Sequence, residues 1–529
     1  MKGVVANEPN PPSMPVSGAP QPWRDAHLRS IGPVLTCLVA IALAQSDTLG
    51  ASQCEMLREE LGHLSTEIVL DDAVLRVVRN DLQTLLNCMP ARGVVKLVVS
   101  DLPLGSVLEI KRPITIEGNG ASIQCPNENQ EKGLRIRSDD VIISNLFFEG
   151  CEFNTTVGLI DVKNSRNVTL EDVQFIENKN GAGPGCISAA MSEIQLLKVE
   201  ARNNSGLLGG VLFAELNSNI TIMGSNFRNN IASKRGGALY LHNSNVRIVD
   251  ATFEGNRAPD GGGAVFAEGT LPSTFFSENV TFSENGAHKQ DEISEVGGAV
   301  ALMAPQLTAE IKTTLFVRNF AKFFGGGMMV NTGENMSILD CHFIENSATT
   351  GGALLAQALA PNITNLEVRG TTFESNSARG NVAGFSNNFG GAIALLGNGT
   401  FVNILDASFS DNMAEGRRGI GGAISGSEIR SIEISRSTFN RNQVAEAKPG
   451  GLINQLEDDD EEQKKKEVQT EDEIIISRGG AISLNDIPVI SIQNSTFTAN
   501  QALIGGAIDI INVRVIFTCK MKSNPCSYL

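Results

Sequence analysis

Two adjacent acids, Asp139 and Asp140, come closest to a catalytic arrangement, because Arg135 and Arg137 lie just before them. Several carboxylates beside an arginine base would suit a calcium-dependent polysaccharide lyase. Paired carboxylates about 6.5–9.5 Å apart would suit an inverting glycoside hydrolase. The acids Glu171–Asp172 could lie a turn or so away in a repetitive fold. Adjacent acids are usually a solvated turn, so Asp139, Asp140 and Arg137 stay candidates only, and we predict no catalytic residue.

Residue types that bind metals or phosphates are scattered. His63, His242, His288 and His342 lack the spacing of metal ligands, and the chain has no Cys-x-x-Cys pair. The stretch Asp260–Gly263 resembles a Gly/Asp-rich calcium turn once, but that turn works by repetition. A phosphate-binding glycine loop followed by Lys-Ser/Thr does not occur. We predict no metal site and no cofactor.

Charge and composition narrow the possible partners. The chain has 42 Lys+Arg against 59 Asp+Glu, and the resulting net charge of −17 disfavours binding to nucleic-acid phosphates. With 41% hydrophobic and 19% charged residues, the main body has enough apolar side chains to fold. Aromatic residues are only 5%, too few to form a platform on which a long glycan stacks. A surface protein or a glycan remains the expected partner, with no nucleic acid.

The N-terminal segment predicts export. Ile31–Ala44 is mostly apolar, follows Arg24 and Arg29, and ends in the small-x-small pattern that signal peptidase cleaves. Residues 1–44 are therefore predicted to be a signal peptide. The mostly apolar stretch has 14 residues, few for a membrane span. An uncleaved anchor is the alternative, and it would be the only membrane contact. The protein is expected to be secreted or held at the cell surface.

Cysteines and sequons fit this export route. Eight cysteines remain after cleavage, an even number that favours disulfides. Their connectivity stays open, although Cys519 and Cys526 are close enough in sequence to pair. Nine Asn-x-Ser/Thr sequons are candidate N-glycosylation sites. These sequons begin at Asn154, Asn167, Asn203, Asn219, Asn279, Asn335, Asn362, Asn398 and Asn494.

A repeated motif dominates the chain. Phe-x-x-Asn occurs ten times in one frame, and in eight copies Ala follows two residues after the Asn. The copies begin at Phe175, Phe227, Phe253, Phe282, Phe316, Phe343, Phe373, Phe409, Phe439 and Phe497, and their asparagines include Asn230, Asn256, Asn346 and Asn412. The 52 residues between Phe175 and Phe227 are twice the 26 that follow. This spacing predicts a copy near Asn203 that has lost its Phe.

A Gly-Gly pair follows most copies and precedes Ala and an aliphatic residue. Examples are Gly236 with Gly237 and Gly262 with Gly263, and Gly326-Gly327-Met328 is interpreted as a degenerate copy. Glycine permits positive φ and close approach of two backbones. The pair therefore predicts a tight corner where neighbouring turns touch.

The residues before each Phe predict two short strands joined by a corner. Apolar residues five and seven positions before the Phe are typical of a strand with one buried face. Three positions before it, most copies have Asp, Asn or Gly, which tolerate the left-handed conformation. The four aspartates at this position are therefore interpreted as turn formers and not as a catalytic row. They are Asp172, Asp250, Asp340 and Asp406.

Repeats of short strands and glycine corners cannot bury their own apolar faces, so neighbouring repeats must stack. Stacking at a strand spacing of ~4.8 Å gives an all-β parallel solenoid. The phenylalanines would form an internal aromatic stack, and the asparagines would bond the corner backbone of adjacent turns. A leucine-rich repeat is the rival solenoid, but its Leu-x-x-Leu-x-Leu frame is missing.

The two interleaved motifs resemble the repeats of the chlamydial polymorphic membrane proteins, over about Asn178–Asp509. The resemblance implies a right-handed parallel β-helix of the pectin-lyase type. The stretch Leu104–Phe148 is similar to the first turns of the wider pectin-lyase-like superfamily, which includes lyases, hydrolases and epimerases. The handedness is implied by the resemblance alone.

Four parts are predicted along the chain. They are the signal peptide (1–44), an N-terminal helical cap (45–90), the β-helix (91–518) with a charged, disordered insertion at about 452–474, and a C-terminal tail (519–529). The cap is predicted from an apolar helical face formed by Leu75, Val78, Leu82, Leu85 and Leu86. Such a cap would cover the strand edges of the first turn.

Loop lengths vary at one corner of the repeat. From Gly-Gly to the next Phe the distance is 17–22 residues, whereas from the motif Asn to the next Gly-Gly it is 5–37. The insertions are Gly286–Val296, Ser377–Phe389 and the segment after Asn442. Loops on one face of a repeat scaffold often bind partners. We therefore favour a structural or adhesive surface protein that binds through this edge, and the alternative is a polysaccharide-active enzyme.

Overall fold

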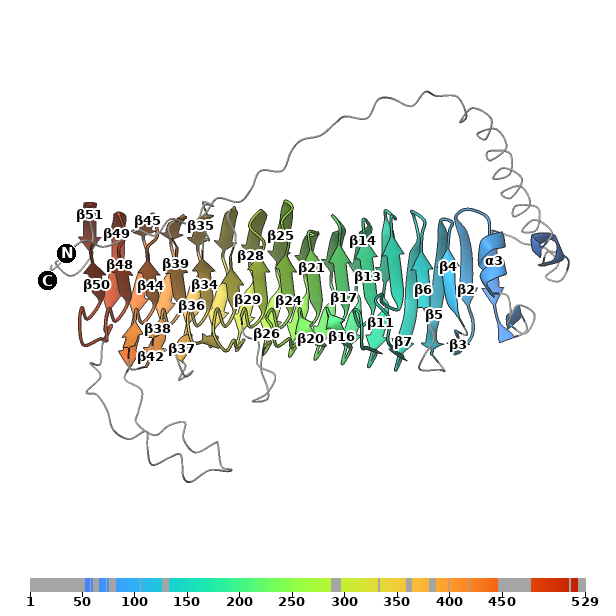
Figure 1. The fold of residues 1–529 in the computed structure, drawn as a ribbon, viewed down its shortest axis with the longest axis horizontal. Helices are drawn as coiled ribbons and strands as arrows, with labels where there is room; N and C mark the ends of the chain where they lie inside the picture. Colours follow the sequence, from blue (N-terminus) through green and yellow to red (C-terminus); the bar gives the residue numbers. More distant parts are fainter. Residues whose placement is uncertain are drawn as a thin grey trace, which may run out of the picture. The chain divides into compact units, whose positions relative to one another are not determined.

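In the computed structural model the chain divides into two units, Met1–Glu59 and Glu60–Leu529. Residues 53–57 of the first unit are helical, and the second unit carries the strands (Figure 1). The structure describes residues 53–57, 59, 66–72, 74–75, 82–104, 106–125, 133–286, 296–331, 334–357, 364–379, 387–397, 399–416, 418–445, 477–512 and 515–521.

We call one turn of the β-helix a coil, and sheet B takes one strand from each of 14 consecutive coils of the second unit. Its 14 parallel strands are β4 (Val107–Ile110), β6 (Gly133–Ile136), β9 (Ile160–Lys163), β13 (Ile187–Ala190), β17 (Leu212–Glu215), β21 (Leu239–His242), β24 (Val265–Glu268), β27 (Val300–Met303), β30 (Met328–Val330), β34 (Leu354–Gln357), β39 (Ile393–Leu396), β44 (Ile424–Ser427), β48 (Ile482–Asn485) and β50 (Ile508–Ile511). In most of them the first and third residues are buried and apolar, so these side chains form the inner face.

Sheet A holds 27 strands and in most coils supplies two of them. They are β1 (Glu67–Leu70), β2 (Gly93–Leu97), β3 (Asp101–Pro103), β5 (Ile114–Gln124), β7 (Ile142–Glu149), β10 (Val168–Glu171), β11 (Gln174–Ile176), β14 (Glu193–Leu197), β15 (Glu200–Arg202), β18 (Asn219–Met223), β19 (Asn226–Arg228), β22 (Asn245–Val249), β23 (Thr252–Glu254), β25 (Ser273–Glu278), β26 (Thr281–Ser283), β28 (Leu307–Lys312), β29 (Leu315–Val317), β31 (Asn335–Leu339), β32 (His342–Ile344), β35 (Thr364–Arg369), β36 (Thr372–Glu374), β40 (Thr400–Leu405), β41 (Ser408–Ser410), β45 (Ser431–Ser435), β46 (Thr438–Asn440), β49 (Val489–Thr498) and β51 (Val515–Met521).

Three small parallel sheets stack at the corner between the second strand of sheet A and sheet B. Sheet C contains β8 (Glu152–Phe153), β12 (Lys179–Asn180), β16 (Ser205–Leu208) and β20 (Ile231–Arg235). Sheet E contains β33 (Ser347–Ala348), β37 (Ser377–Arg379), β42 (Met413–Glu415) and β47 (Gln443–Ala445). Sheet D contains β38 (Asn387–Phe389) and β43 (Arg418–Ile420). Every strand pair that the structure describes is parallel, which confirms the predicted all-β parallel β-helix.

The framed phenylalanines stack inside the coils. From Phe227 to Phe497 each ring lies 4.5–5.0 Å from the next, centroid to centroid, with interplanar angles of 19° or less. The residue that pairs in register with both Phe175 and Phe227 is Ala201. The structure therefore confirms that one copy, next to Asn203, has lost its Phe.

The asparagines three residues after these positions form a buried hydrogen-bonded ladder. At Asn230, for example, Nδ2 donates to Asn256 Oδ1 (3.0 Å) and to the Ala201 carbonyl of the preceding coil (2.9 Å). The main-chain N–H of Asn230 also donates to Asn256 Oδ1 (3.0 Å). The ladder runs through Asn178, Asn204, Asn230, Asn256, Asn285, Asn319, Asn346, Asn376, Asn412, Asn442 and Asn500.

The two glycines of each pair have different roles. The first has positive φ, as at Gly236 (65°) and Gly262 (58°). The second lies against the next coil: a Cβ on Gly237 would come within 2.0 Å of the Gly263 carbonyl oxygen. In the degenerate copy, Gly325 has the positive φ (61°). The pair there is thus Gly325-Gly326 and not Gly326-Gly327, because Gly327 takes the place of the following Ala.

The corner three residues before each Phe position is left-handed throughout. Asp172, Asp250, Asp340 and Asp406 have φ values of 51–54°. Thr313 (44°) adopts the same conformation although its side chain does not favour it. The aspartates are therefore turn formers, as the sequence predicts.

The helix α3 (Leu82–Cys88) covers the free edge of sheet B at β4. Leu85 and Leu86 of this helix are buried. The Gln83 side chain accepts from the Glu109 main-chain N–H (2.6 Å) and donates to the Glu109 carbonyl (2.8 Å), so both edge groups are paired. The first parallel pair, β1 with β2, begins at Glu67, upstream of the position where the sequence placed the start of the coils.

Cysteines divide into paired and free groups. Cys125 and Cys151 form a disulfide between consecutive coils. Cys54 and Cys88 each take part in a disulfide. Cys186 and Cys341 are free and buried, so the expectation from the even number of cysteines does not hold for them. Cys186 takes an apolar core position, whereas the Cys341 thiol donates to the Ile311 and Leu339 carbonyls, as the Thr371 hydroxyl does in the next coil to its own neighbours. The predicted Cys519–Cys526 pair lies outside the side chains that the structure describes.

Candidate functional site

The candidate cluster near Asp139 lies in one coil, but Arg137 bonds to the next one. Arg137 follows β6, and its guanidinium pairs with the carboxylate of Asp161 on β9 and donates to the Asp161 carbonyl (2.8 Å). The same carboxylate accepts from the Ser188 hydroxyl on β13 (2.8 Å). Asp161 is 8% exposed. This arrangement stabilises a buried carboxylate and leaves Arg137 committed to it.

Asp139 and Asp140 lie at an exposed corner. The Asp139 carboxylate accepts from the main-chain N–H of Arg166 (2.7 Å), and the Asp140 carboxylate accepts from the Asn167 amide (2.8 Å). Asp140 itself has a positive φ of 54°. The two acids thus bond the next coil, as corner residues do, and Arg137 faces Asp161 instead. The acids Glu171–Asp172 have an ion-pair partner of their own, Lys198, at 3.4 and 3.7 Å.

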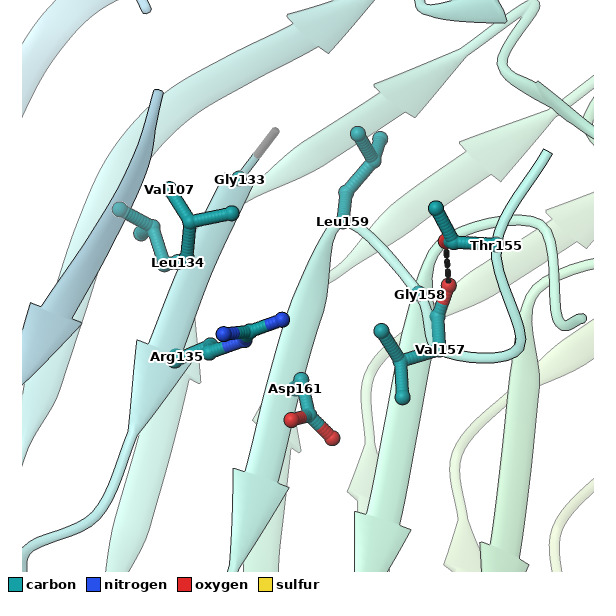
Figure 2. A pocket seen from close by; sticks show the side chains of 9 residues that line it. All are labelled: Val107, Gly133, Leu134, Arg135, Thr155, Val157, Gly158, Leu159 and Asp161. Carbon is teal, nitrogen blue, oxygen red and sulfur yellow. Dashed lines mark hydrogen bonds between the residues drawn. The ribbon is translucent and has the colours of Figure 1, made fainter. Parts of the chain in front are cut away.

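A small hollow lies beside this cluster (Figure 2). Arg135 and Asp161 border it from adjacent strands, and Thr155, Val157 and Leu159 border it from the corner before β9. Its volume of about 10 Å³ leaves room for roughly one water molecule, far below the roughly 300–1,000 Å³ typical of ligand pockets. The hollow is too small to enclose a sugar ring with its neighbours.

A second cluster, on the outer face of sheet B, is not evident from the sequence. The Tyr240 hydroxyl on β21 donates to the carboxylate of Glu268 on β24, and Arg235 pairs with the other oxygen of that carboxylate (2.6 Å). The Arg235 guanidinium also lies 4.9 Å from the centre of the Phe266 ring. Burial, and then the hydrogen bond to Glu268, raise the pKa of Tyr240. The phenol therefore stays protonated at neutral pH and donates to Glu268.

An apolar strip continues from this cluster along sheet B. Because side chains alternate along a strand, the second residue of each strand points to the outer face. Consecutive strands place these residues in one row by register: Phe213, Tyr240, Phe266, Ala301, Met329, Leu355 and Ala394. Half-buried side chains pack against the row, among them Val296, Met303, Phe324, Phe389 and Leu396. We call this row and its flanking side chains the outer strip.

The insertions return to the fold beside the outer strip. The residues just before the Gly pairs are bridged from coil to coil in the order Val296, Phe324, Thr350, Phe389, Ile420 and Arg478. Val296, Phe389 and Arg478 end the three insertions, and thus lie in one row. Val296 and Phe389 also pack on the outer strip. The insertions themselves, including 452–474, lie largely outside the described residues.

The remaining sequence predictions fall in different places. Seven sequon asparagines are described, and all are exposed: Asn154, Asn167, Asn203, Asn219, Asn279, Asn335 and Asn494. Asn362, Asn398 and residues 1–44 lie outside the described part. Within the described ranges, no group of His, Cys, Asp and Glu could hold a metal ion. The helices among those residues are too short or too polar to cross a bilayer.

Comparisons with known proteins support the repeat. Residues 250–268 match the family model described as the Chlamydia polymorphic membrane protein repeat, which confirms the resemblance. No curated protein is significantly similar in sequence.

Two solved structures that align with the chain are polysaccharide-active proteins. One is a PL6 alginate lyase in complex with a trisaccharide. The two sequences are 12% identical, the alignment covers 65% of this chain and 85% of that chain, and the TM-score is 0.35. The other is the A-module of the Azotobacter vinelandii mannuronan C-5 epimerase AlgE4. The two sequences are 13% identical, the alignment covers 68% of this chain and 95% of that chain, and the TM-score is 0.29. At these TM-scores we draw no argument about activity from either.

Proposed function

We propose that this chain is a secreted or surface-displayed β-helical protein that binds a partner through the insertion corner and the adjoining outer strip. One observation carries the proposal: three insertions rejoin the fold in a single row, and two of their end residues, Val296 and Phe389, pack on the outer strip. Long loops that converge on one side of a rigid repeat scaffold are typical of binding surfaces. The partner is a surface protein or a glycan.

The chemistry of the strip supports binding over catalysis. The row from Tyr240 to Ala394 is itself buried, at no more than 6% exposed. The half-buried aliphatic and aromatic side chains of the strip, such as Phe213, Phe324 and Leu396, would contribute binding energy by being covered further. The polar groups nearest to the strip already bond to one another, because the Glu268 carboxylate accepts hydrogen bonds from both Tyr240 and Arg235. A residue that acts as a general acid or base needs a hydrogen-bonding atom that is free to reach the substrate.

The test removes the insertions and keeps the coils. The coil at Asn346 joins its Gly pair through only four residues, Ser347–Thr350. Each insertion, Gly286–Val296, Ser377–Phe389 and Gln443–Arg478, is replaced by those four residues. A control variant shortens residues 358–363, between sheets B and A, to the two residues Asn243–Ser244 that serve there in an uninserted coil.

Both variants and the unaltered chain are applied to arrays of purified extracellular-matrix proteins and of glycans. We expect the unaltered chain and the control to bind the same array members, and the triple replacement to lose at least tenfold in affinity with an unchanged circular dichroism spectrum. Equal binding by the triple replacement would refute the proposal.

A further inference from the structure

Asparagines in this chain divide into two groups by burial and by sequence context. The eleven ladder asparagines are inside the coils, and ten of them are 0–1% exposed. None begins a sequon, because Ala follows two residues later in eight of them, and Asn, Gly or Val in the others. The seven described sequon asparagines are all exposed. Every described sequon asparagine is therefore reachable from outside the coils, whereas no ladder asparagine begins a sequon.

The exposed sequons also lie on particular faces. Asn219 and Asn335 begin strands of sheet A, Asn494 lies within β49, and Asn279 lies between β25 and β26. Asn167 precedes β10 and Asn203 follows β15, so six of the seven belong to sheet A or its corners. The seventh is Asn154, at the corner before β9. The described strands of sheet B contain no sequon.

The local geometry leaves these amides able to carry a substituent. Asn219 and Asn335 use their Oδ1 atoms to accept from Asn245 (2.8 Å) and Asn365 (2.7 Å), so Nδ2 is directed away from those bonds. Asn279 donates from Nδ2 to Asp250 (2.6 Å). A substituted amide keeps one N–H, so this bond is compatible with modification as well.

We propose that the exposed sequon asparagines carry N-linked oligosaccharides, which shield sheet A and its corners and leave the outer strip on sheet B bare. The inference rests on the export that the proposed function requires. In the transfer, Nδ2 bonds to C1 of an oligosaccharide held on a lipid diphosphate. The C1–O bond to the diphosphate breaks, the diphosphate leaves with the bonding electrons, and the amide gives up one proton. A bare sheet B is the face that remains open to a partner.

The sites are mapped on the full chain purified from its own cells. Treatment with peptide N-glycosidase in H₂¹⁸O converts each glycosylated Asn to ¹⁸O-labelled Asp, which peptide mass spectrometry locates. We expect label at the exposed sequons and none on the ladder. A secreted, folded chain without label would overturn this inference and leave the proposed function standing. A chain confined to the cytoplasm would refute both.

A matched pair of variants tests whether the burial of the ladder excludes glycans. Ala232→Thr creates a sequon at Asn230, whereas Ala232→Val adds nearly the same volume at the same buried site without one. In a eukaryotic secretory host we expect at least tenfold less secretion of Ala232→Thr than of Ala232→Val. An inhibitor of oligosaccharide transfer should remove that difference. Equal secretion of the two variants without the inhibitor, with Asn230 glycosylated, would show that the coil tolerates a glycan at the ladder. That result would overturn the proposal that only exposed asparagines carry glycans.

Discussion

Each ladder asparagine from Asn178 to Asn442 uses every hydrogen-bonding group of its side chain. Asn256, for instance, donates through Nδ2 to Asn285 and to the Phe227 carbonyl, and its Oδ1 accepts twice from Asn230. A side chain of this length with both donors and acceptors is needed, because each coil must supply and receive bonds at the same point. The ladder therefore pairs polar groups that would otherwise be buried without partners.

Removing one ladder amide should be costly. Asn256→Ala removes the acceptor of the Asn230 main-chain N–H and of one Nδ2–H of Asn230, and each unsatisfied buried group costs about 1–3 kcal/mol. We expect the free energy of unfolding to fall by about 3 kcal/mol or more in urea denaturation. Asn365→Ala is the control, because Asn365 is exposed, and it should cost less than about 0.5 kcal/mol. Similar losses for both variants would contradict this account of the ladder.

The free thiols should be inert in the folded protein. Burial is the main cause that raises the pKa of Cys341 from its ordinary value of 9.0 to about 12, and burial also raises the pKa of Cys186. A thiol with a raised folded pKa stabilises folding below pH 9, and this contribution is lost as pH rises from there towards 12. Iodoacetamide at pH 8 should label both cysteines only after guanidinium unfolding, as read by mass spectrometry. Rapid labelling of the native chain would show that these sites are open.

Residues that act within one repeat could be predicted, and residues that meet across coils could not. The stacked rings and the left-handed aspartates follow from local spacing. The Tyr240, Glu268 and Arg235 cluster joins side chains up to 33 positions apart, and its register depends on loop lengths that vary from coil to coil. Arg137 was associated with Asp139 for the same reason, although it pairs with Asp161 one coil further on.

Among the repeated elements, the Gly pair permits the least variation, since the space at its second position is filled by the next coil. Gly237→Ala would place Cβ 2.0 Å from the Gly263 carbonyl oxygen and 2.4 Å from the Arg257 nitrogen, both backbone atoms. At Gly506, the same motif position in the last described pair, a Cβ would meet nothing within 4 Å.

These two glycines give a matched test of coil contact. We expect Gly237→Ala to lower the unfolding free energy by more than about 3 kcal/mol, because the backbone must shift to relieve the overlap. Gly506→Ala should change it by less than about 1 kcal/mol. Thermal denaturation of the two variants measures the difference. Equal stability would mean that the coils are not packed at this corner as described.

The N-terminal end of the β-helix is harder to predict from the sequence than the repeated coils. β1 pairs with β2 in sheet A. It carries neither motif, so the sequence alone does not indicate that it belongs to the sheet. The apolar face of Leu85 and Leu86 predicted a helix. The paired bonds of Gln83 to Glu109, by which that helix protects the sheet edge, depend on a contact 26 residues away.

At the scale of the whole molecule, the residues that hold the coils together are separate from the corner at which the insertions vary. The rings, amides and glycines that hold neighbouring coils together are inside, and they recur from coil to coil. Insertions vary in length at one corner without disturbing the stacked register of Val296, Phe389 and Arg478. A scaffold of this kind can change its binding loops at little cost to its core.

The central claim is that this β-helix binds a partner and does not turn over a polysaccharide. The direct measurement is release of unsaturated or reducing sugar from a panel of acidic polysaccharides by the purified, folded chain, with and without Ca²⁺. We predict no release above the blank. Release that is lost in Asp139→Ala, Asp140→Ala or Glu268→Gln would contradict the claim and identify a catalytic site on the N-terminal coils or on the outer face of sheet B.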